Sequence, residues 1–122
     1  ALILSINKLS YSTPEIFVQL IKAGANINLQ DRFGKTALML TIQKINYCMN
    51  DYTKIDILVD IINLLIDKGA NIKIKDNKGN TVRTYINKII DGSIKKIVEN
   101  ILYKSILIKN TSGKITLGVP NK

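Results

Sequence analysis

Residues 24–36 read Gly-Ala-Asn-Ile-Asn-Leu-Gln-Asp-Arg-Phe-Gly-Lys-Thr, and residues 69–81 read Gly-Ala-Asn-Ile-Lys-Ile-Lys-Asp-Asn-Lys-Gly-Asn-Thr. The two stretches are near copies separated by 45 positions, with the Gly, Ala, Asp and Thr residues in register. A fixed offset of this kind indicates a repeat array, in which each unit buries its apolar face against its neighbours. We therefore expect function to reside on a surface that several units share rather than in a pocket.

Apolar spacing predicts two helices in each unit. A pattern with spacing i, i+1, i+4, i+5 occurs at Ile16–Ile21, at Ile61–Ile66 and again at Ile97–Leu102. This spacing places four apolar side chains on one stripe of a helix. An i, i+4, i+7 stripe lies upstream of the first two patterns, at Leu2–Leu9 and at Leu38–Ile45, and predicts the first helix of each unit. Each unit therefore reads as helix, turn, helix, extended turn.

Local signals mark the helix ends. Ser12 with Glu15 and Thr53 with Asp56 have the spacing of capping boxes, which predicts that the second helices begin at these positions. Glycines follow the second helices, and others follow an Asp by three residues in tight turns. These glycines are expected at positive φ, in structural positions: Gly24, Gly69, Gly34 and Gly79.

The run Gly-Ala-x-x-x-x-x-Asp-x-x-Gly-x-Thr-Ala-Leu at residues 24–38 resembles the ankyrin repeat, whose period is about 33 residues with a β-turn and two helices. The resemblance covers residues 1 to about 102 and implies an all-α fold, an ankyrin-type helix-turn-helix solenoid with short extended turns between repeats. Where the family commonly has Thr-Pro-Leu-His, this chain has Thr-Ala-Leu-Met at 36–39 and Thr-Val-Arg-Thr at 81–84. The chain therefore lacks the Pro and His that usually form a hydrogen-bond network between neighbouring repeats of the family.

The resemblance divides the chain as one ankyrin-repeat domain, residues 1–122. Residues 1–30 are a partial first repeat, 31–75 a second repeat with a long insertion between its helices, 76–105 a third, degenerate repeat, and 106–122 a C-terminal tail or a short hairpin. The middle unit exceeds the family period by about 12 residues. We interpret this surplus, which falls at residues 45–52, as an extended first helix and a longer loop. Because Ala1 already lies within a predicted helix, we expect flanking repeats in a longer chain.

The family resemblance implies binding of another protein through the turn tips and the concave face of the first helices. It carries this role onto the following residues of the second and third units: Arg32, Phe33, Lys35, Gln43, Lys44, Asn77, Lys78 and Asn80. Phe33 is a candidate anchor because an aromatic ring supplies more contact energy than a charged side chain. The alternatives are that Phe33 packs on a neighbouring turn or helix, and that the lysines are a solvated surface.

The long connection of the middle unit is a second candidate contact surface. In an antiparallel helix pair this connection lies at the end opposite the turn tips, so extra length there does not disturb the stacking of units. The insertion contains Tyr47, Met49 and Tyr52. The tyrosines could present a binding surface, or they could pack over a lengthened helix.

Residue content argues against catalysis. The chain has no His and a single cysteine, Cys48, so it lacks a neutral-pH base and an imidazole metal ligand. We expect no enzyme activity, no metal and no cofactor. A lone cysteine suits a reducing, intracellular compartment, and the most apolar segment, residues 55–66, is too short to span a bilayer.

The net charge of +9 raises the question of nucleic acid. All of the 18 basic residues except Arg32 and Arg83 are lysines, whereas base readout and bidentate phosphate binding favour Arg. The lysines are also scattered along the chain. We therefore interpret the charge as compositional and expect a protein partner. The alternatives are a structural spacer within a larger repeat protein and, less favoured, a basic surface for nucleic acid or anionic lipid.

Overall fold

The computed structural model describes residue 3 and residues 15–110, and this part of the chain is helical, with no strand. The elements are α2 (Glu15–Lys22), α3 (Ala37–Ile45), the short 3-10 helix η1 (Asn46–Cys48), α4 (Tyr52–Asp67), α5 (Val82–Asn87) and α6 (Gly92–Asn110). The all-α prediction is confirmed.

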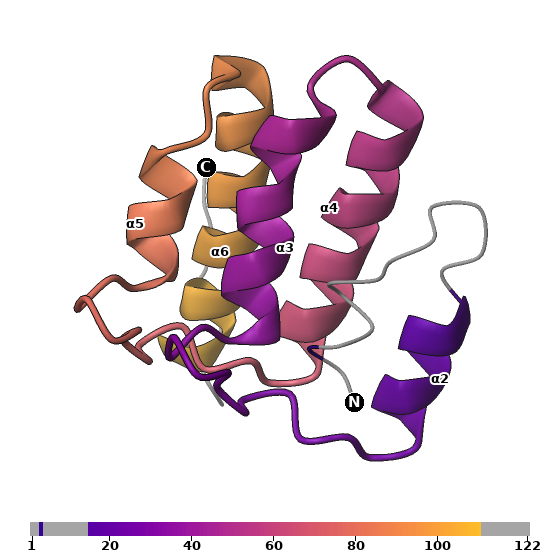
Figure 1. Cartoon of the computed structure of the whole chain (residues 1–122), viewed down its shortest axis with the longest axis vertical. Coiled ribbons are helices and arrows are strands. Elements are labelled where there is room, and N and C mark those ends of the chain that lie inside the picture. The colour runs from indigo at the N-terminus through magenta and orange to yellow at the C-terminus, as the bar shows by residue number, and fades with distance from the viewer. Residues whose placement is uncertain (1–2, 4–14, 111–122) are drawn as a thin grey trace.

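The helices form antiparallel pairs that stack side by side (Figure 1). α3 packs against α4 and α5, and α6 packs against both α4 and α5. The connections within the pairs lie at one end of the stack, and the turns that link one pair to the next lie at the opposite end. This arrangement is the helix-turn-helix solenoid that the sequence predicts.

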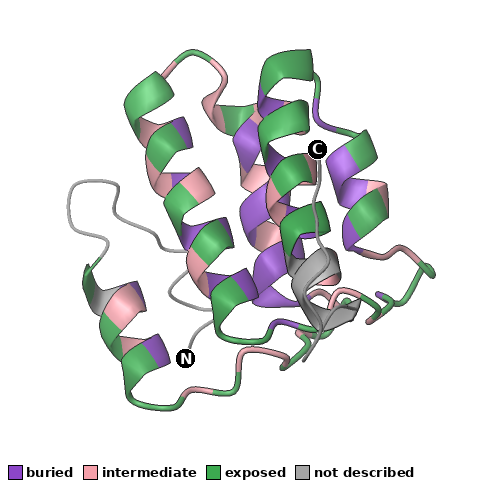
Figure 2. Ribbon diagram, turned by 180° about the vertical axis from the view of Figure 1, so that it is seen from behind, coloured by how far each residue is buried: buried purple, intermediate pink, exposed green. Residues whose placement is uncertain are grey.

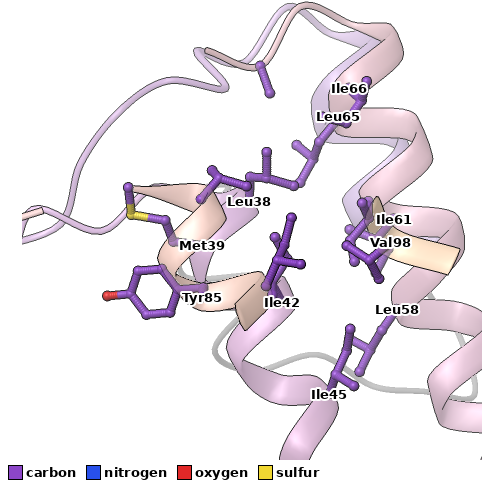
Figure 3. Close-up of a cluster of buried hydrophobic side chains, with 14 of the residues drawn as sticks. Leu38, Met39, Ile42, Ile45, Leu58, Ile61, Leu65, Ile66, Tyr85 and Val98 are labelled. Carbon is purple, nitrogen blue, oxygen red and sulfur yellow. The ribbon is translucent and has the colours of Figure 1, made fainter. Parts of the chain in front are cut away.

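The core lies between the helix pairs. Leu38, Ile42 and Ile45 of α3 are almost completely buried, as their predicted stripe requires. They face residues of α4 such as Ile61 and Leu65 (Figure 3). Buried residues line the inward sides of the helices and exposed residues the outward sides (Figure 2). Each such buried aliphatic side chain contributes about 1.5–3 kcal/mol to folding, so the stripe explains why the pairs stack.

The stripe predicted in the third unit is only partly correct. Val98 and Leu102 are buried, but Ile97 is about half exposed and Ile101 is only partly buried. Ile94 takes the remaining buried position, so the buried row follows i, i+4, i+8. Within the part of the chain that the structure describes, α6 packs against α4 and α5 only, so a narrower stripe is enough to cover this contact face.

The second helix of the middle unit begins earlier than predicted. Asp51, not Thr53, is the N-cap of α4, and its side chain accepts a hydrogen bond from the backbone N–H of Lys54 at 3.2 Å. An Asp at this position caps as well as a Thr would, and capping there lets Tyr52 join the helix. Other expectations lie outside the described residues: the first helix at Leu2–Leu9, the Ser12 cap and the surroundings of Ala1.

The insertion does not extend the first helix as an α-helix. α3 ends at Ile45, and η1 and a turn connect it to α4, which has 16 residues. The interpretation of an extended first helix is therefore wrong. The α-helix ends at Ile45 because Asn, Tyr and Cys, at positions 46–48, are weak helix formers. Met49 still packs against the core, as its place on the stripe suggests.

The helix α6 continues through Asn110, so residues 105–108 do not form the first strand of a hairpin. No Gly or Pro interrupts the chain between Ser93 and Asn110, and Ile106 extends the row of Val98 and Leu102 by one turn. The helix therefore continues because its apolar row still packs against the core and no helix-breaking residue interrupts it. Residues 111–122 lie outside the described part of the chain.

Candidate functional site

The turn at residues 31–35 is held by one carboxylate. Oδ1 of Asp31 accepts the backbone N–H groups of Phe33 and Lys35, each at 2.9 Å, and the Asp31 N–H donates to the carbonyl of Lys35 at 2.9 Å. An Asp that caps its own turn in this way fixes the backbone path. The side chain of Phe33 is therefore carried on a defined tip.

The next turn repeats this geometry. Oδ1 of Asp76 accepts from the N–H of Lys78 at 2.9 Å and of Asn80 at 2.8 Å. Its other oxygen accepts the hydroxyl of Tyr85 and, at 3.1 Å, the amide of Asn80. The two tips are thus near copies in structure as well as in sequence.

The Tyr85 hydroxyl changes the ionisation of this pair. Its hydrogen bond holds the pKa of Asp76 well below the ordinary value of 3.8, against an opposing effect of burial. Burial and the neighbouring carboxylate raise the pKa of Tyr85 to about 12. At neutral pH the pair is therefore a carboxylate and a neutral phenol, which is the arrangement that best satisfies the buried turn.

All four repeated glycines adopt positive φ, as predicted: 88° at Gly24, 81° at Gly34, 91° at Gly69 and 82° at Gly79. Gly34 has a second constraint. A Cβ at this position would lie 2.6 Å from Oδ1 and 2.7 Å from the backbone N of Asn77. The close approach of the next tip therefore depends on the missing side chain.

Hydrogen bonds join neighbouring tips. The backbone N–H of Asn77 donates to the carbonyl of Phe33 at 2.9 Å, and its amide donates to the carbonyl of Arg32 at 2.8 Å. Nε2 of Gln30 donates to the carbonyls of Gly34 at 2.8 Å and Lys75 at 2.9 Å. The chain therefore has a network between repeats without the Pro and His of the family motif.

Phe33 is exposed at the tip. The residue is 54 % exposed, and the Arg32 guanidinium lies 4.9 Å and the Lys35 ammonium 5.8 Å from the ring centroid. The ring is flanked by cations rather than enclosed by a neighbouring helix. This cation-flanked ring is the main feature of the surface that we call the tip strip: Arg32, Phe33, Lys35 and Lys78.

The remaining predicted contact residues have different surroundings. Nζ of Lys35 donates to Oε1 of Gln43 at 3.3 Å, which joins the tip to α3. Lys44 is partly exposed in the last turn of α3, towards the opposite end of the helix. The amides of Asn77 and Asn80 are engaged in the turns, as given above, so their side chains have a structural task within the chain.

The long connection lies at the end opposite the tips, as expected (Figure 1). Tyr47 and Tyr52 are 82 % and 69 % exposed, so the alternative in which they pack over a helix does not hold. Asn46 links this connection to the third unit, because its Nδ2 donates to the carbonyl of Lys88 at 2.9 Å and its Oδ1 accepts the N–H of Ile90 at 3.0 Å. Ile90 is itself 78 % exposed.

Sequence reasoning missed the residues that join the repeats. Gln30 and Asn28 bind backbone atoms of the second copy of the repeated sequence, at Lys75 and at Asn71, whose N–H donates to Asn28 at 2.7 Å. Asn46 binds the backbone of the third unit at Lys88. A signal was present in the sequence. At the offset of 45, the amide residues Asn28 and Gln30 correspond to Lys73 and Lys75, so the copies differ where one unit faces the next.

The described residues hold no group of three or more His, Cys, Asp or Glu side chains that could bind a metal ion. Among the same residues, no helix is long and apolar enough to cross a membrane. Cys48 is partly buried and packs against the core, as a small apolar side chain would.

Comparison with known proteins identifies part of the chain. The family model described as Ankyrin repeat matches residues 33–77, which include the tip of Phe33, α3, the long connection and α4. No curated protein matches the chain.

Proposed function

Since this chain contains an ankyrin repeat, a fold that serves generally in protein–protein interaction, we propose that it binds a protein partner through the tip strip of Arg32, Phe33, Lys35 and Lys78. The Lys35–Gln43 pair extends the proposed surface onto α3. Asn77 and Asn80 belong to its edge, and Lys44, in the last turn of α3, marks the far end of the proposed concave surface.

One observation carries the proposal: an exposed aromatic ring stands on a turn whose backbone is tied both to its own Asp and to the next tip. A rigid tip loses little conformational entropy on binding. Aromatic and Arg side chains are enriched among the residues that dominate interface energies. Phe33 and Arg32 together supply both kinds at one position.

The spacer alternative predicts that the tips contact nothing. Under that alternative the exposed ring of Phe33 has no role, and it is one of several single apolar side chains exposed on the surface. The hydrogen bonds between the tips serve stacking under either reading. The exposed ring is the feature that only the binding reading uses.

Affinity measurement with the Phe33→Ala variant tests the proposal. Proteins captured by the immobilised chain are identified, and the one that binds most tightly is purified. Calorimetric titration then measures its affinity for the wild type and for the variant. We expect Phe33→Ala to raise the dissociation constant about tenfold or more, which corresponds to a loss of about 1.4 kcal/mol in binding free energy. The matched control is Ile97→Ala, which removes an exposed apolar side chain of α6 outside both proposed surfaces, and Ile90→Ala reports on the opposite end of the stack.

Two outcomes would contradict the proposal. In one, no captured protein binds again in purified form, as a spacer would behave. In the other, Ile90→Ala weakens binding and Phe33→Ala does not, which would place the interface at the opposite end. Circular dichroism of the variants checks that the helices are retained.

A second candidate surface, formed by Tyr47, Tyr52 and Ile90, is proposed at the end of the long connection. The support is that three large apolar side chains are exposed on two segments that Asn46 joins. Tyrosine suits protein interfaces because its ring gives apolar contact and its hydroxyl can hydrogen-bond to the partner or to water. The Ile90→Ala titration above also measures this surface.

A further inference from the structure

A groove of about 910 Å³ lies beside the turn at residues 76–80, and its lining includes Lys75 and Thr81, which flank that turn. The groove is also lined by Asn28, by Gly69 and the segment after it, by the start of α5 and by Ile106 of α6. None of the residues proposed above for the tip strip is among its lining. Its size lies within the range of about 300–1,000 Å³ that ligand clefts occupy.

Three cations line this groove: Lys73, Lys75 and Arg83. All three are exposed, and no Asp or Glu is among the lining residues. The nearest acidic residue in the sequence, Asp76, is buried and committed to its turn and to Tyr85. The groove therefore presents positive charge that no described carboxylate balances.

Comparison of the two sequence copies, residues 24–38 and 69–83, shows that this charge is specific to the second copy. At the offset of 45, Lys73 and Lys75 replace Asn28 and Gln30, and Arg83 replaces the buried Leu38. In the first copy these positions contact the following copy through hydrogen bonds, or lie in the core. In the second copy all three residues are cations, and the groove brings them together.

The groove also has an apolar component. Ile72 and Ile106 are partly buried and contribute to its wall. The guanidinium of Arg83 lies 5.6 Å from the ring centroid of Tyr103, which holds its planar group beside α6. A held guanidinium can bind a carboxylate with two parallel hydrogen bonds.

We propose that this groove binds an acidic peptide segment in which carboxylates flank an apolar side chain. The carboxylates pair with Lys73, Lys75 and Arg83, and the apolar side chain lies against Ile72 and Ile106. The inference rests on the proposed role in protein binding, but it concerns a separate surface. A protein segment fits better than nucleic acid, because the lining has one Arg, no aromatic ring for stacking bases and two isoleucines.

The test uses a labelled peptide, Glu-Glu-Ile-Glu-Glu, and its uncharged counterpart, Gln-Gln-Ile-Gln-Gln, in fluorescence anisotropy titrations of the whole chain. A triple variant, Lys73→Gln/Lys75→Gln/Arg83→Gln, removes the groove cations. A charge-matched control, Lys22→Gln/Lys88→Gln/Lys96→Gln, removes the same charge from other exposed positions. Backbone amide shifts of residues 71–75 and 83 report whether the peptide occupies the groove.

We expect the acidic peptide to bind, to shift the amides of residues 71–75 and 83, and to lose at least tenfold in affinity in the groove variant. The control variant should lose less than threefold, and the uncharged peptide should bind at least tenfold more weakly. Phe33→Ala should leave this affinity unchanged, so failure of the tip-strip proposal remains distinguishable from failure of this one.

Three results would overturn the inference. Equal losses in the two triple variants would show that only net charge matters. Equal binding of the two peptides would show that the carboxylates are not recognised. Tighter, groove-dependent binding of a duplex oligonucleotide or of phosphatidylserine vesicles would assign the groove to phosphate groups instead.

Discussion

At the scale of single residues, Gly34 and Gly79 form a matched pair. Both have φ near +80°, but an added Cβ would collide with Asn77 only at Gly34. We expect Gly79→Ala to lower the free energy of unfolding by about 1 kcal/mol, and Gly34→Ala by about 2–3 kcal/mol, because the second change also separates the two tips. Urea denaturation measures both values. Equal losses would mean that the contact between the tips contributes nothing to stability.

The Tyr85 hydroxyl gives a pH-dependent prediction. Because the folded pKa of Asp76 lies below its ordinary value of 3.8, the carboxylate stabilises the fold above that pH, and the contribution is lost as the pH falls through the folded pKa. Tyr85→Phe removes the largest cause of the shift. We expect the pKa of Asp76 to rise towards 3.8. The free energy of unfolding should therefore fall less between pH 6 and pH 3 in the variant than in the wild type.

A carbon-detected NMR titration of the Asp76 carboxyl, together with urea unfolding at the two pH values, measures this effect. Tyr103→Phe is the control, since its ring is exposed and contacts Arg83 rather than a carboxylate. An unchanged Asp76 titration in Tyr85→Phe would show that the turn N–H groups alone set the ionisation of this residue.

At the scale of elements, the helices and turns followed from local patterns. The stripe of Leu38, Ile42 and Ile45 and the Asp-led turns were predictable because spacing, capping and glycine conformation depend on a few neighbouring residues. The start of α4 was misplaced because two capping residues, Asp51 and Thr53, compete within three positions. The end of α6 was missed because a continuing helix leaves no signal except the absence of a breaker.

The candidate site was less predictable than the fold. Phe33 and the lysines could be assigned to a turn, but the exposure of the ring depends on how the next repeat packs. The contacts of Gln30 with Lys75 and of Asn46 with Lys88 depend on the stacking of segments more than 40 residues apart in sequence. Only the mismatch between the copies at those positions indicated that they differ in role.

The Asn46 side chain connects two elements, and its removal gives a further prediction. It makes two hydrogen bonds to the backbone of residues 88–90, in exposed surroundings. We expect Asn46→Ala to lower the free energy of unfolding by about 1 kcal/mol and to speed hydrogen exchange in residues 88–91, because the freed groups bond to water instead. Asn50→Ala, an exposed residue of the same connection, should change neither. If the two variants exchange alike, the link does not restrain this loop.

At the scale of the whole molecule, the chain is a stack in which each unit stabilises its neighbour and both ends of the helix pairs remain free to carry binding residues. One end carries the cation-flanked Phe33, and the other carries Tyr47, Tyr52 and Ile90. The two ends are separated by the length of the helices. A partner that binds one end therefore need not contact the other.

The most direct test of the proposed function is the footprint of a purified partner, measured by hydrogen exchange of the chain with and without that partner. If the tip strip is the interface, protection should appear in residues 31–36 and 76–80, with residues 46–52 and 88–91 unchanged. Protection confined to residues 46–52 and 88–91, with none at the tips, would contradict the account.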